Sequence, residues 1–205
     1  MTPQPGSTSL ERSLFPRITI VTPAISGDQY LEATLRSVIY QDYPNLEFIV
    51  IEDGASNERR RILEKYESHF SWQICRPDTE LCAAMNMAFA KSSGVILGWL
   101  EPGDMLHTNG LSVIGGVFGS FPDVEWITGR PFNFSPSGMP TGMKQLERWS
   151  RIRFLAGGNK YIHRDTTFWR RLLWGRAGGR LLPPTAQGES SIYLSASSAT
   201  RSFTL

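Results

Sequence analysis

Acidic residues recur just after short apolar segments of this sequence; these residues are Glu52, Asp53, Asp78, Glu101 and Asp104. Carboxylates accept hydrogen bonds from the N–H groups of a base and from ribose hydroxyls. They also hold Mg²⁺ or Mn²⁺, which can in turn carry a diphosphate. An Asp in such a place can equally be a turn or capping residue. Because the pattern recurs at successive segment ends, it favours a binding site.

The segments that position these acids alternate between two hydrophobic periods. Short apolar runs predict strands at Ile18–Val21, Phe48–Ile51, Trp72–Cys75, Val95–Leu100 and Val124–Thr128. Apolar residues at helical spacing predict helices between them, at Leu31–Ile39 (capped by Asp28), from Asn57 as cap to Tyr66, at Leu81–Phe89 and at Leu111–Phe118. This alternation predicts βαβ units and a mainly parallel sheet, with ligands bound outside the carboxyl ends of the strands.

The loop after the first expected strand has no phosphate-binding glycine motif. It is Thr22-Pro23-Ala24-Ile25-Ser26-Gly27, and Pro23 is expected to end the strand because proline cannot donate to a sheet ladder. A dinucleotide site of the Rossmann type would need G-x-G-x-x-G here, and a P-loop is also absent. The backbone amides of this turn are therefore not expected to hold phosphate.

Beyond Gly129 the hydrophobic periodicity weakens. Residues 131–142 are expected to form a loop and residues 144–155 a basic helix. Asp165 is expected to cap a short helix that carries the apolar residues of Phe168–Leu173.

Length and composition predict one domain with flexible ends. The 205 residues are 40% hydrophobic, which excludes a wholly disordered chain. No apolar run approaches the roughly 18 residues of a membrane-spanning helix. Residues 1–16 are expected to be a flexible segment without a secretory signal, so we expect a cytoplasmic protein. Residues 183–205, where Ser, Ala and Thr dominate, are predicted to form a disordered, low-complexity tail.

The net charge of +2 hides an asymmetry along the chain. Residues 1–140 hold 10 Lys and Arg against 16 Asp and Glu, whereas residues 141–205 hold 11 against 3. A basic face attracts anionic lipid headgroups, phosphorylated substrates or nucleic acid. We expect no nucleic-acid partner, and the basic segment 144–180 is the candidate for peripheral contact with the inner face of the membrane. The alternative is that the basic part covers the acidic part within the molecule.

Several stretches resemble family 2 glycosyltransferases, which have the GT-A fold. They are Ile18–Pro23, Tyr30–Val38 with Gln41–Pro44, Phe48–Ser56, Asp78–Asn86, Gly94–Leu100 with the acidic turn after it, and Thr166–Arg171 with Leu173-Trp174. The resemblance implies one Rossmann-like α/β domain over residues 17–182, with a mainly parallel sheet flanked by helices. It also implies a donor half at 17–129 and a partial acceptor half at 130–182.

The resemblance further implies which residues bind a nucleotide-sugar donor. Thr22 and Pro23 match the loop that lies along the nucleotide base. Asp53 matches the acid that accepts a hydrogen bond from the base N–H, with Glu52 as its neighbour.

Other matched positions lie beneath the sugar and the diphosphate. Asp78 and Asn86 match the pair under ribose and diphosphate, and Glu101 matches the first acid of the family's D-x-D turn, which faces ribose. The position of the metal-binding acid in that turn is Gly103 here, which departs from the family. Either Asp104 supplies the ligand for Mn²⁺ or Mg²⁺, or the dependence on metal is weakened; we expect Asp104 to be the ligand.

The acceptor half departs further from the family. An inverting transfer needs a base that takes the proton of the acceptor hydroxyl. After Glu125 the only acids are Glu147, Asp165 and Glu189, and none matches the family's base motif. The base is therefore unassigned, with Asp165 as a candidate.

The resemblance thus predicts an inverting glycosyltransferase. It would move a sugar from a nucleotide-diphospho-sugar, the UDP-sugar being the family's common donor, to a glycan or a lipid-linked acceptor. The alternative is a truncated, catalytically impaired glycosyltransferase remnant that binds nucleotide without transfer.

Overall fold

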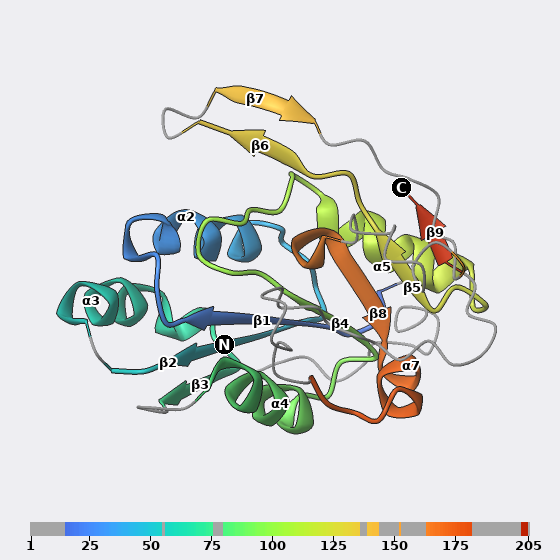
Figure 1. The fold of residues 1–205 in the computed structure, drawn as a ribbon, viewed down its shortest axis with the longest axis horizontal. Coiled ribbons are helices and arrows are strands. Elements are labelled where there is room, and N and C mark those ends of the chain that lie inside the picture. The colour runs from blue at the N-terminus through green and yellow to red at the C-terminus, as the bar shows by residue number, and fades with distance from the viewer. Residues whose placement is uncertain are drawn as a thin grey trace.

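The computed structural model describes residues 15–54, 56–75, 80–135, 139–143, 152, 163–181 and 202–204. A central sheet lies between two sets of helices, as Figure 1 shows. The predicted α/β class, with a mostly parallel sheet flanked by helices, is confirmed. The predicted division into halves at residues 129 and 130 stays a prediction.

The central sheet has the strand order β3-β2-β1-β4-β8-β5-β9. Its strands are β1 (Ile18–Ala24), β2 (Leu46–Glu52), β3 (Trp72–Cys75), β4 (Ile96–Trp99), β5 (Trp126–Thr128), β8 (Thr167–Arg170) and β9 (Ser202–Thr204). Strands β3, β2, β1 and β4 are parallel, and β8 runs antiparallel between β4 and β5. The five predicted strands are all present.

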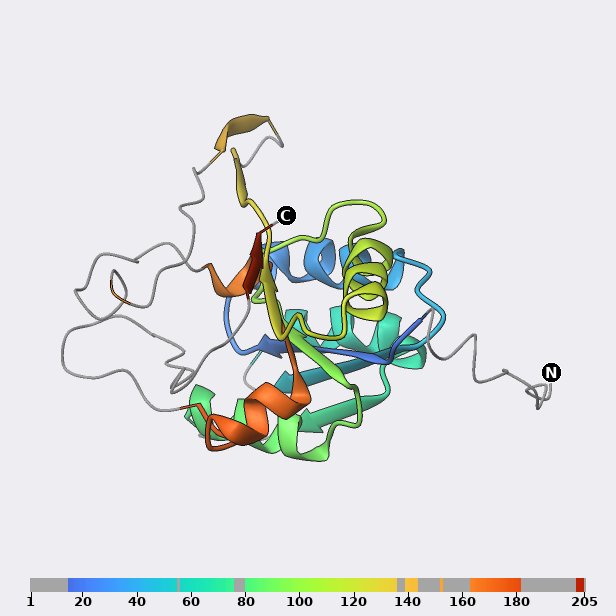
Figure 2. The ribbon, with the colours of Figure 1, turned by 90° about the vertical axis from the view of Figure 1, so that its right-hand side faces the viewer.

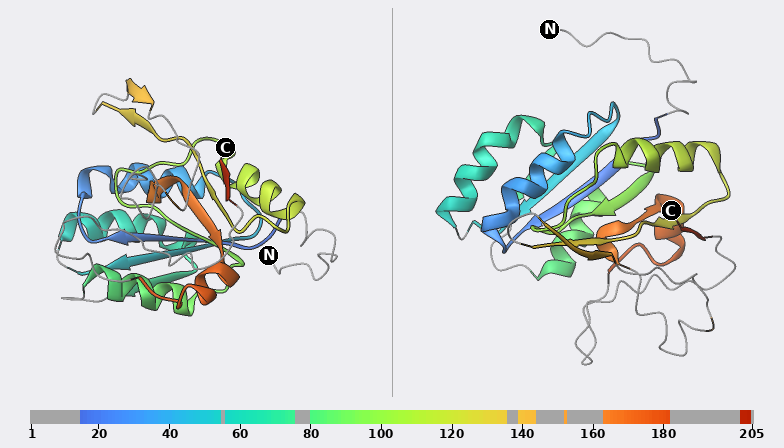
Figure 3. Two further views of the ribbon diagram at one scale, coloured as in Figure 1. Left: turned by 45° about the vertical axis from the view of Figure 1, so that its right-hand side comes forward. Right: turned by 90° about the horizontal axis from the view of Figure 1, so that it is seen from above.

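Helices cover both faces of this sheet (Figure 3). The helices are α2 (Asp28–Ile39), α3 (Asn57–Tyr66), α4 (Leu81–Lys91), α5 (Gly110–Ser120) and α7 (Arg171–Arg176), with the 3-10 turns η1 (Glu67–His69) and η2 (Arg164–Thr166). Side chains of α2, α3 and α5 share one hydrophobic cluster, and those of α4 and α7 share the other. Among the described residues, no helix is long and apolar enough to cross a membrane.

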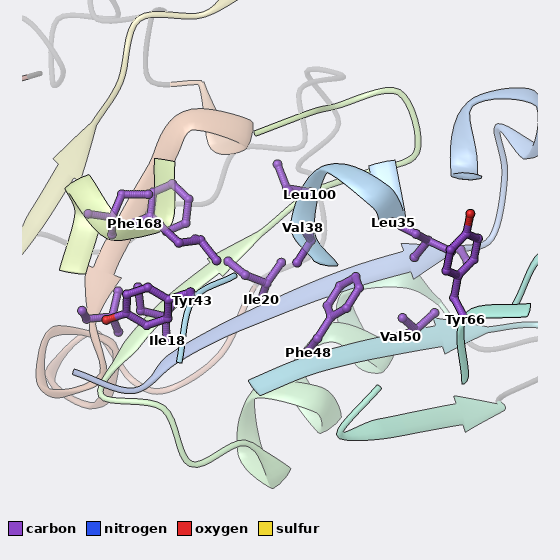
Figure 4. Close-up of a cluster of buried hydrophobic side chains, with 14 of the residues drawn as sticks. Ile18, Ile20, Leu35, Val38, Tyr43, Phe48, Val50, Tyr66, Leu100 and Phe168 are labelled. Carbon is purple, nitrogen blue, oxygen red and sulfur yellow. The ribbon is translucent and has the colours of Figure 1, made fainter. Parts of the chain in front are cut away.

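Successive side chains of the buried strands point to opposite faces of the sheet and so pack in the two clusters alternately. In β1, Ile20 packs with Leu35 and Phe48 on the side of α2 (Figure 4), whereas Val21 packs in the cluster that includes α4. This is the period of two that a strand buried on both faces requires. In the second cluster, Trp169 lies 5.7 Å from the Phe89 ring, measured between centroids.

Strand β1 does not stop at Thr22 as predicted but continues through Pro23, which pairs with Ile51 of β2. The carbonyl of Val21 accepts a hydrogen bond from Leu100 on the side of β4. Residues two apart in a strand face the same way, so the Pro23 nitrogen faces the side where β4 has already ended at Trp99. Proline is tolerated here because no partner strand needs its missing N–H.

Two helix caps differ from the prediction by one residue. Ser56, not Asn57, caps α3, and its side chain accepts a hydrogen bond from the Arg59 N–H. Gly27, not Asp28, is the N-cap of α2, with a left-handed φ of 72° that suits glycine. The Asp28 carboxylate is thereby available for an ion pair, described below.

Residues 131–142 form more than the predicted loop. Strands β6 (Phe132–Phe134) and β7 (Pro140–Met143) pair as an antiparallel hairpin that projects from the body of the protein (Figure 2). The predicted helix through Phe168 is also wrong: Phe168 and Trp169 lie in β8, and a helix begins only at Arg171. Both side chains are buried in a strand because β8 closes the gap between β4 and β5.

Two predictions fall mostly outside the described residues. Apart from residue 152, the predicted basic helix at 144–155 is not described. In the predicted tail, only Ser202–Thr204 are described, and they form β9 beside β5. The prediction of disorder for the rest of 183–205 and the predicted flexible segment at 1–16 stay predictions.

Candidate functional site

The carboxyl ends of β1, β2 and β4 lie at one edge of the sheet, because these strands are parallel and adjacent. Ala24 pairs with Glu52 across β1 and β2, and Val21 pairs with Trp99 across β1 and β4. The predicted site residues at this edge, called the carboxyl edge below, are Thr22, Pro23, Glu52, Asp53, Glu101 and Asp104.

Two buried polar atoms at the carboxyl edge have no hydrogen-bond partner in the described part of the chain. They are Oγ1 of Thr22 and Nε1 of Trp99, whose residues are 0% and 4% exposed. A buried polar atom without a partner costs about 1–3 kcal/mol. A bound polar ligand is one way in which that cost is offset.

Asp53 is held by an ion pair with Arg59 of α3. The same guanidinium binds Asp28 at the start of α2, with 2.8 Å between Nε and Oδ1. Hydrogen bonds from Ser56 and Arg59 lower the pKa of Asp28. Arg59 is buried, so this bridge fixes the end of β2 against two helices. A carboxylate offers about four acceptor positions, so an ion pair does not by itself exclude a hydrogen bond from a base N–H.

Glu52 and Asn86, which were also assigned to the nucleotide, both form hydrogen bonds within the protein. Glu52 accepts a hydrogen bond of 2.7 Å from Nε2 of Gln73 on β3. Asn86, in α4, donates to the Leu181 carbonyl at 3.0 Å and accepts from the Leu181 N–H at 2.6 Å. The structure therefore uses both ends of the Asn86 amide to hold the chain at Leu181. Asp78 lies outside the described residues.

The acidic turn after β4 is closed by its own side chain. Oδ2 of Asp104 accepts a hydrogen bond of 3.1 Å from the Glu101 N–H, and the Asp104 N–H donates to the Glu101 carbonyl at 2.9 Å. The buried hydroxyl of Thr34 in α2 accepts from the Gly103 N–H at 2.9 Å. Gly103 has φ 108°, which a residue with a side chain adopts only under strain. The turn therefore favours glycine at the position where the family has an acid.

Arg164 and Asp165 reach this turn from η2. Arg164 forms an ion pair with Glu101, 63 positions away, and its guanidinium carbon lies 5.8 Å from the centroid of the Trp99 ring. Burial raises the pKa of Glu101, and the charge of Asp165 adds to the rise while Arg164 opposes it. Burial, followed by the charge of Asp165, raises the pKa of Asp104 to about 6. Asp165 thus lies within electrostatic reach of the turn and is not the helix cap that the sequence predicts, since His163 and Arg170 are the N-caps of η2 and α7.

The described residues do not fit a divalent cation as they stand. Among them, no three Asp, Glu, His or Cys side chains are grouped so that they could hold a metal. Gly103 offers no side-chain ligand, one oxygen of Asp104 is used within the turn, and Arg164 already pairs with Glu101. The assignment of Asp104 as a metal ligand stays a prediction.

Sequence reasoning missed three residues that shape the carboxyl edge: Thr34, Arg59 and Arg164. Thr34 follows the apolar stripe of α2 and carries no signal of its contact with a turn 69 positions later. Arg59 belongs to a run of three arginines in α3, and only its burial singles it out. Arg164 directly precedes Asp165, the candidate base, and this position could have indicated that Arg164 lies near the site.

Arginines of the basic second half bond within the molecule. Arg170 donates to the carbonyls of Val124 and Phe118, at 2.6 and 2.7 Å. Arg171 donates to the Gly94 carbonyl at 2.7 Å, and Arg176 pairs with Glu125. The ion pairs of Arg176 with Glu125 and of Arg164 with Glu101 agree with the alternative in which the basic part covers the acidic part within the molecule. Residues 144–151 and 153–162 of the proposed membrane-contacting segment lie outside the described residues.

The raised pKa of Asp104 leads to a stability prediction. Its folded value of about 6 lies above its ordinary 3.8, so folding binds a proton between these pH values and stability falls as pH rises through them. Asp104→Asn keeps an acceptor for the Glu101 N–H but cannot ionise. We expect the variant to be more stable than wild type by about 1–2 kcal/mol at pH 7.5, after allowance for solvent screening. Urea unfolding at two pH values measures this; a gain that persists undiminished near pH 4 would contradict it.

The family model for glycosyl transferase family 2 matches residues 19–167, and the chain belongs to this family. An uncharacterised glycosyltransferase of Rickettsia prowazekii is 26% identical over 94 residues, which are 46% of this chain and 29% of the relative. The poly(ribitol-phosphate) β-N-acetylglucosaminyltransferase TarS of Staphylococcus aureus is 21% identical over 96 residues, 44% of this chain and 17% of the relative. The chain thus spans about a third or less of the length of these curated relatives.

Solved structures show the same GT-A fold. S. aureus TarS 1–349 in complex with UDP has a TM-score of 0.67 at 13% identity, over 92% of this chain and 60% of that one. The mannosyltransferase PcManGT of Pyrobaculum calidifontis, in complex with GDP-Man and Mn²⁺, has a TM-score of 0.64 at 16% identity, over 93% of this chain and 55% of that one.

Proposed function

We propose that this chain binds a nucleotide-diphospho-sugar at its carboxyl edge and transfers the sugar, with inversion, to a glycan or a lipid-linked acceptor. The observation that carries the proposal is that Asp53, Glu101 and Asp104 follow the carboxyl ends of parallel strands of one sheet in a family 2 fold, with Asp165 close enough to act on the pKa of Glu101 and Asp104. Ligands of open α/β sheets bind at this edge. TarS structures with UDP and with UDP-GlcNAc make a UDP-sugar the first donor to test.

In this proposal the base lies along Thr22 and Pro23, and Asp53 accepts its N–H, with Glu52 beside it. Glu101 faces the ribose hydroxyls, which are donors to a carboxylate. The Thr22 hydroxyl, which has no hydrogen-bond partner among the described residues, supports a polar ligand at this edge. Asp78 and Asn86 complete the floor in the family's pattern. For Asn86 this role requires its amide to leave the backbone of Leu181.

The transfer step requires one base. The acceptor oxygen attacks the anomeric carbon, the bond from that carbon to the phosphate oxygen breaks, and the diphosphate leaves with the electron pair. The acceptor proton passes to the base. We assign this base to Asp165, because it is the only Asp or Glu among the described residues after 129 and it lies within electrostatic reach of Glu101 and Asp104.

A second candidate function is nucleotide binding without transfer. The acidic turn favours it, because Gly103 supplies no side-chain ligand at the position of the family's metal-binding acid. Turnover distinguishes the two candidates: a transferase releases nucleotide diphosphate from a labelled donor, and a binding remnant does not.

The proposed base contact is tested at Asp53. Asp53→Ala should weaken binding of UDP, or of whichever nucleoside diphosphate binds best, by about 1.5–3 kcal/mol, because it removes a charged acceptor for the base N–H. Titration calorimetry measures the change.

Asp28→Ala is the matched control, because it removes the other carboxylate that pairs with Arg59. Both variants should lose similar stability, but Asp28→Ala should keep its nucleotide affinity. Equal weakening by the two variants would mean that Asp53 acts only by positioning Arg59, and unchanged affinity of Asp53→Ala would remove it from the site.

A further inference from the structure

A permanent cation already lies in the acidic cluster of the carboxyl edge. The Arg164 guanidinium pairs with Glu101, and its charge acts on the pKa of both Glu101 and Asp104. An arginine does not lose its proton in proteins. The cluster of Glu101, Asp104 and Asp165 is therefore partly neutralised by a residue of the chain itself.

The same cluster lacks the second acid of a D-x-D turn. Gly103 stands at that position, and its φ of 108° means that an aspartate there would be strained. Asp104, one residue later, uses Oδ2 to close the turn on the Glu101 N–H. The turn therefore has no carboxylate at position 103, and the carboxylate of Asp104 is already hydrogen-bonded within the turn.

An unpartnered donor lies beside the guanidinium. The Trp99 ring is 5.8 Å from the Arg164 guanidinium carbon, and its Nε1–H has no partner in the described part of the chain although the residue is only 4% exposed. A guanidinium has five N–H donors, of which Glu101 takes only part. Charged and neutral N–H donors on neighbouring side chains suit the oxygens of a phosphate, which are strong acceptors.

We propose that Arg164, and not a divalent cation, neutralises the diphosphate of the donor. This inference rests on the proposed function and adds to it the group that stabilises the leaving diphosphate. When the bond between the anomeric carbon and the phosphate oxygen breaks, the negative charge that develops on the diphosphate faces the Arg164 fork. Guanidinium and phosphate form bidentate, charge-assisted hydrogen bonds, which suit this task.

The test is a set of calorimetric titrations with UDP, GDP and the matching monophosphates, in EDTA and in Mn²⁺. Wild type should bind its preferred diphosphate in EDTA with nearly the affinity seen in Mn²⁺. Arg164→Gln should weaken the diphosphate in EDTA about tenfold or more, and the monophosphate much less, as expected for a lost charge-assisted contact. Arg164→Lys keeps the charge without the fork and should show an intermediate loss.

The control is Arg176→Gln, which also removes an arginine from an ion pair, with Glu125, on α7. It should leave all affinities unchanged. Diphosphate binding that requires Mn²⁺ and survives Arg164→Gln would overturn the inference and support Asp104 as a metal ligand. Absence of binding by wild type to every nucleotide, with and without Mn²⁺, would instead overturn the proposed function. If Arg164→Gln does not fold, the test uses Arg164→Lys. A diphosphate affinity of Arg164→Lys that equals that of wild type, in EDTA as well as in Mn²⁺, would contradict the bidentate contact.

Discussion

Asp165→Asn should lower the rate of sugar transfer about 10²–10⁴-fold, the usual effect of losing a general base. The side chain keeps its size, so the fold should be unchanged. Asp165 acts on the pKa of Glu101 and Asp104, which places it within electrostatic reach of the proposed donor site. The contribution of a base is made in the transition state, so nucleotide affinity should change by no more than about threefold.

A radiolabelled-donor assay and a nucleotide titration on the same preparation measure the two quantities. Glu64→Gln, an exposed change on α3, is the matched control for loss of one acid. An unchanged rate would reject Asp165 as the base. Wild type that binds nucleotide without turnover would support the remnant in its place.

Glu47→Ala should lower the free energy of unfolding by about 1.5–3 kcal/mol, the range for losing hydrogen bonds to a charged group. Glu47 is 2% exposed in β2, at the end of the strands opposite the carboxyl edge. Its carboxylate accepts hydrogen bonds from Thr19 Oγ1 at 2.6 Å and from the N–H groups of Ser93 and Gly94 at 2.7 and 3.1 Å. Alanine would take this acceptor from the buried Thr19 hydroxyl and from the Ser93 N–H, whereas the Gly94 N–H would keep Thr19 Oγ1 as its acceptor at 3.0 Å.

The same carboxylate gives a pH signature. Burial alone would raise the pKa of Glu47, but the hydrogen bonds from Thr19, Ser93 and Gly94 outweigh burial and lower it. A group with a lowered folded pKa stabilises the protein above its unfolded pKa, and this stabilisation is lost as pH falls through the folded value. Denaturant unfolding of wild type and Glu47→Gln should therefore differ most near neutral pH and converge in acid. A stability difference that does not shrink in acid would contradict the assignment, and nucleotide affinity should not change in either variant.

The strands and helices of the first 128 residues were predictable because each carries its own hydrophobic period. Val21 and Ile20 alternate between two cores, and the Leu31–Ile39 stripe repeats at helical spacing. The boundaries were less predictable. Pro23 remains in β1 because β4 ends at Trp99, which pairs with Val21 two residues before Pro23, and this depends on the neighbouring strand.

After Gly129 the pattern alone was misleading. The spacing of Phe168 and Trp169 resembles that of an amphipathic helix. They nevertheless lie in β8, because this segment pairs with β4 on one side and β5 on the other. Local spacing cannot distinguish these outcomes when the segment is short and apolar.

The sequence by itself determined the α/β class, the family and the placing of acids after successive strands, because these depend on local period and on spacing along the chain. Only the tertiary structure decided how those acids are paired. Asp53 meets Arg59 and Asp28, and Glu101 meets Arg164 from 63 positions away. Such pairings depend on which strand ends and helices pack side by side, so no local pattern encodes them. The cation beside the acidic turn is therefore visible only in the folded chain.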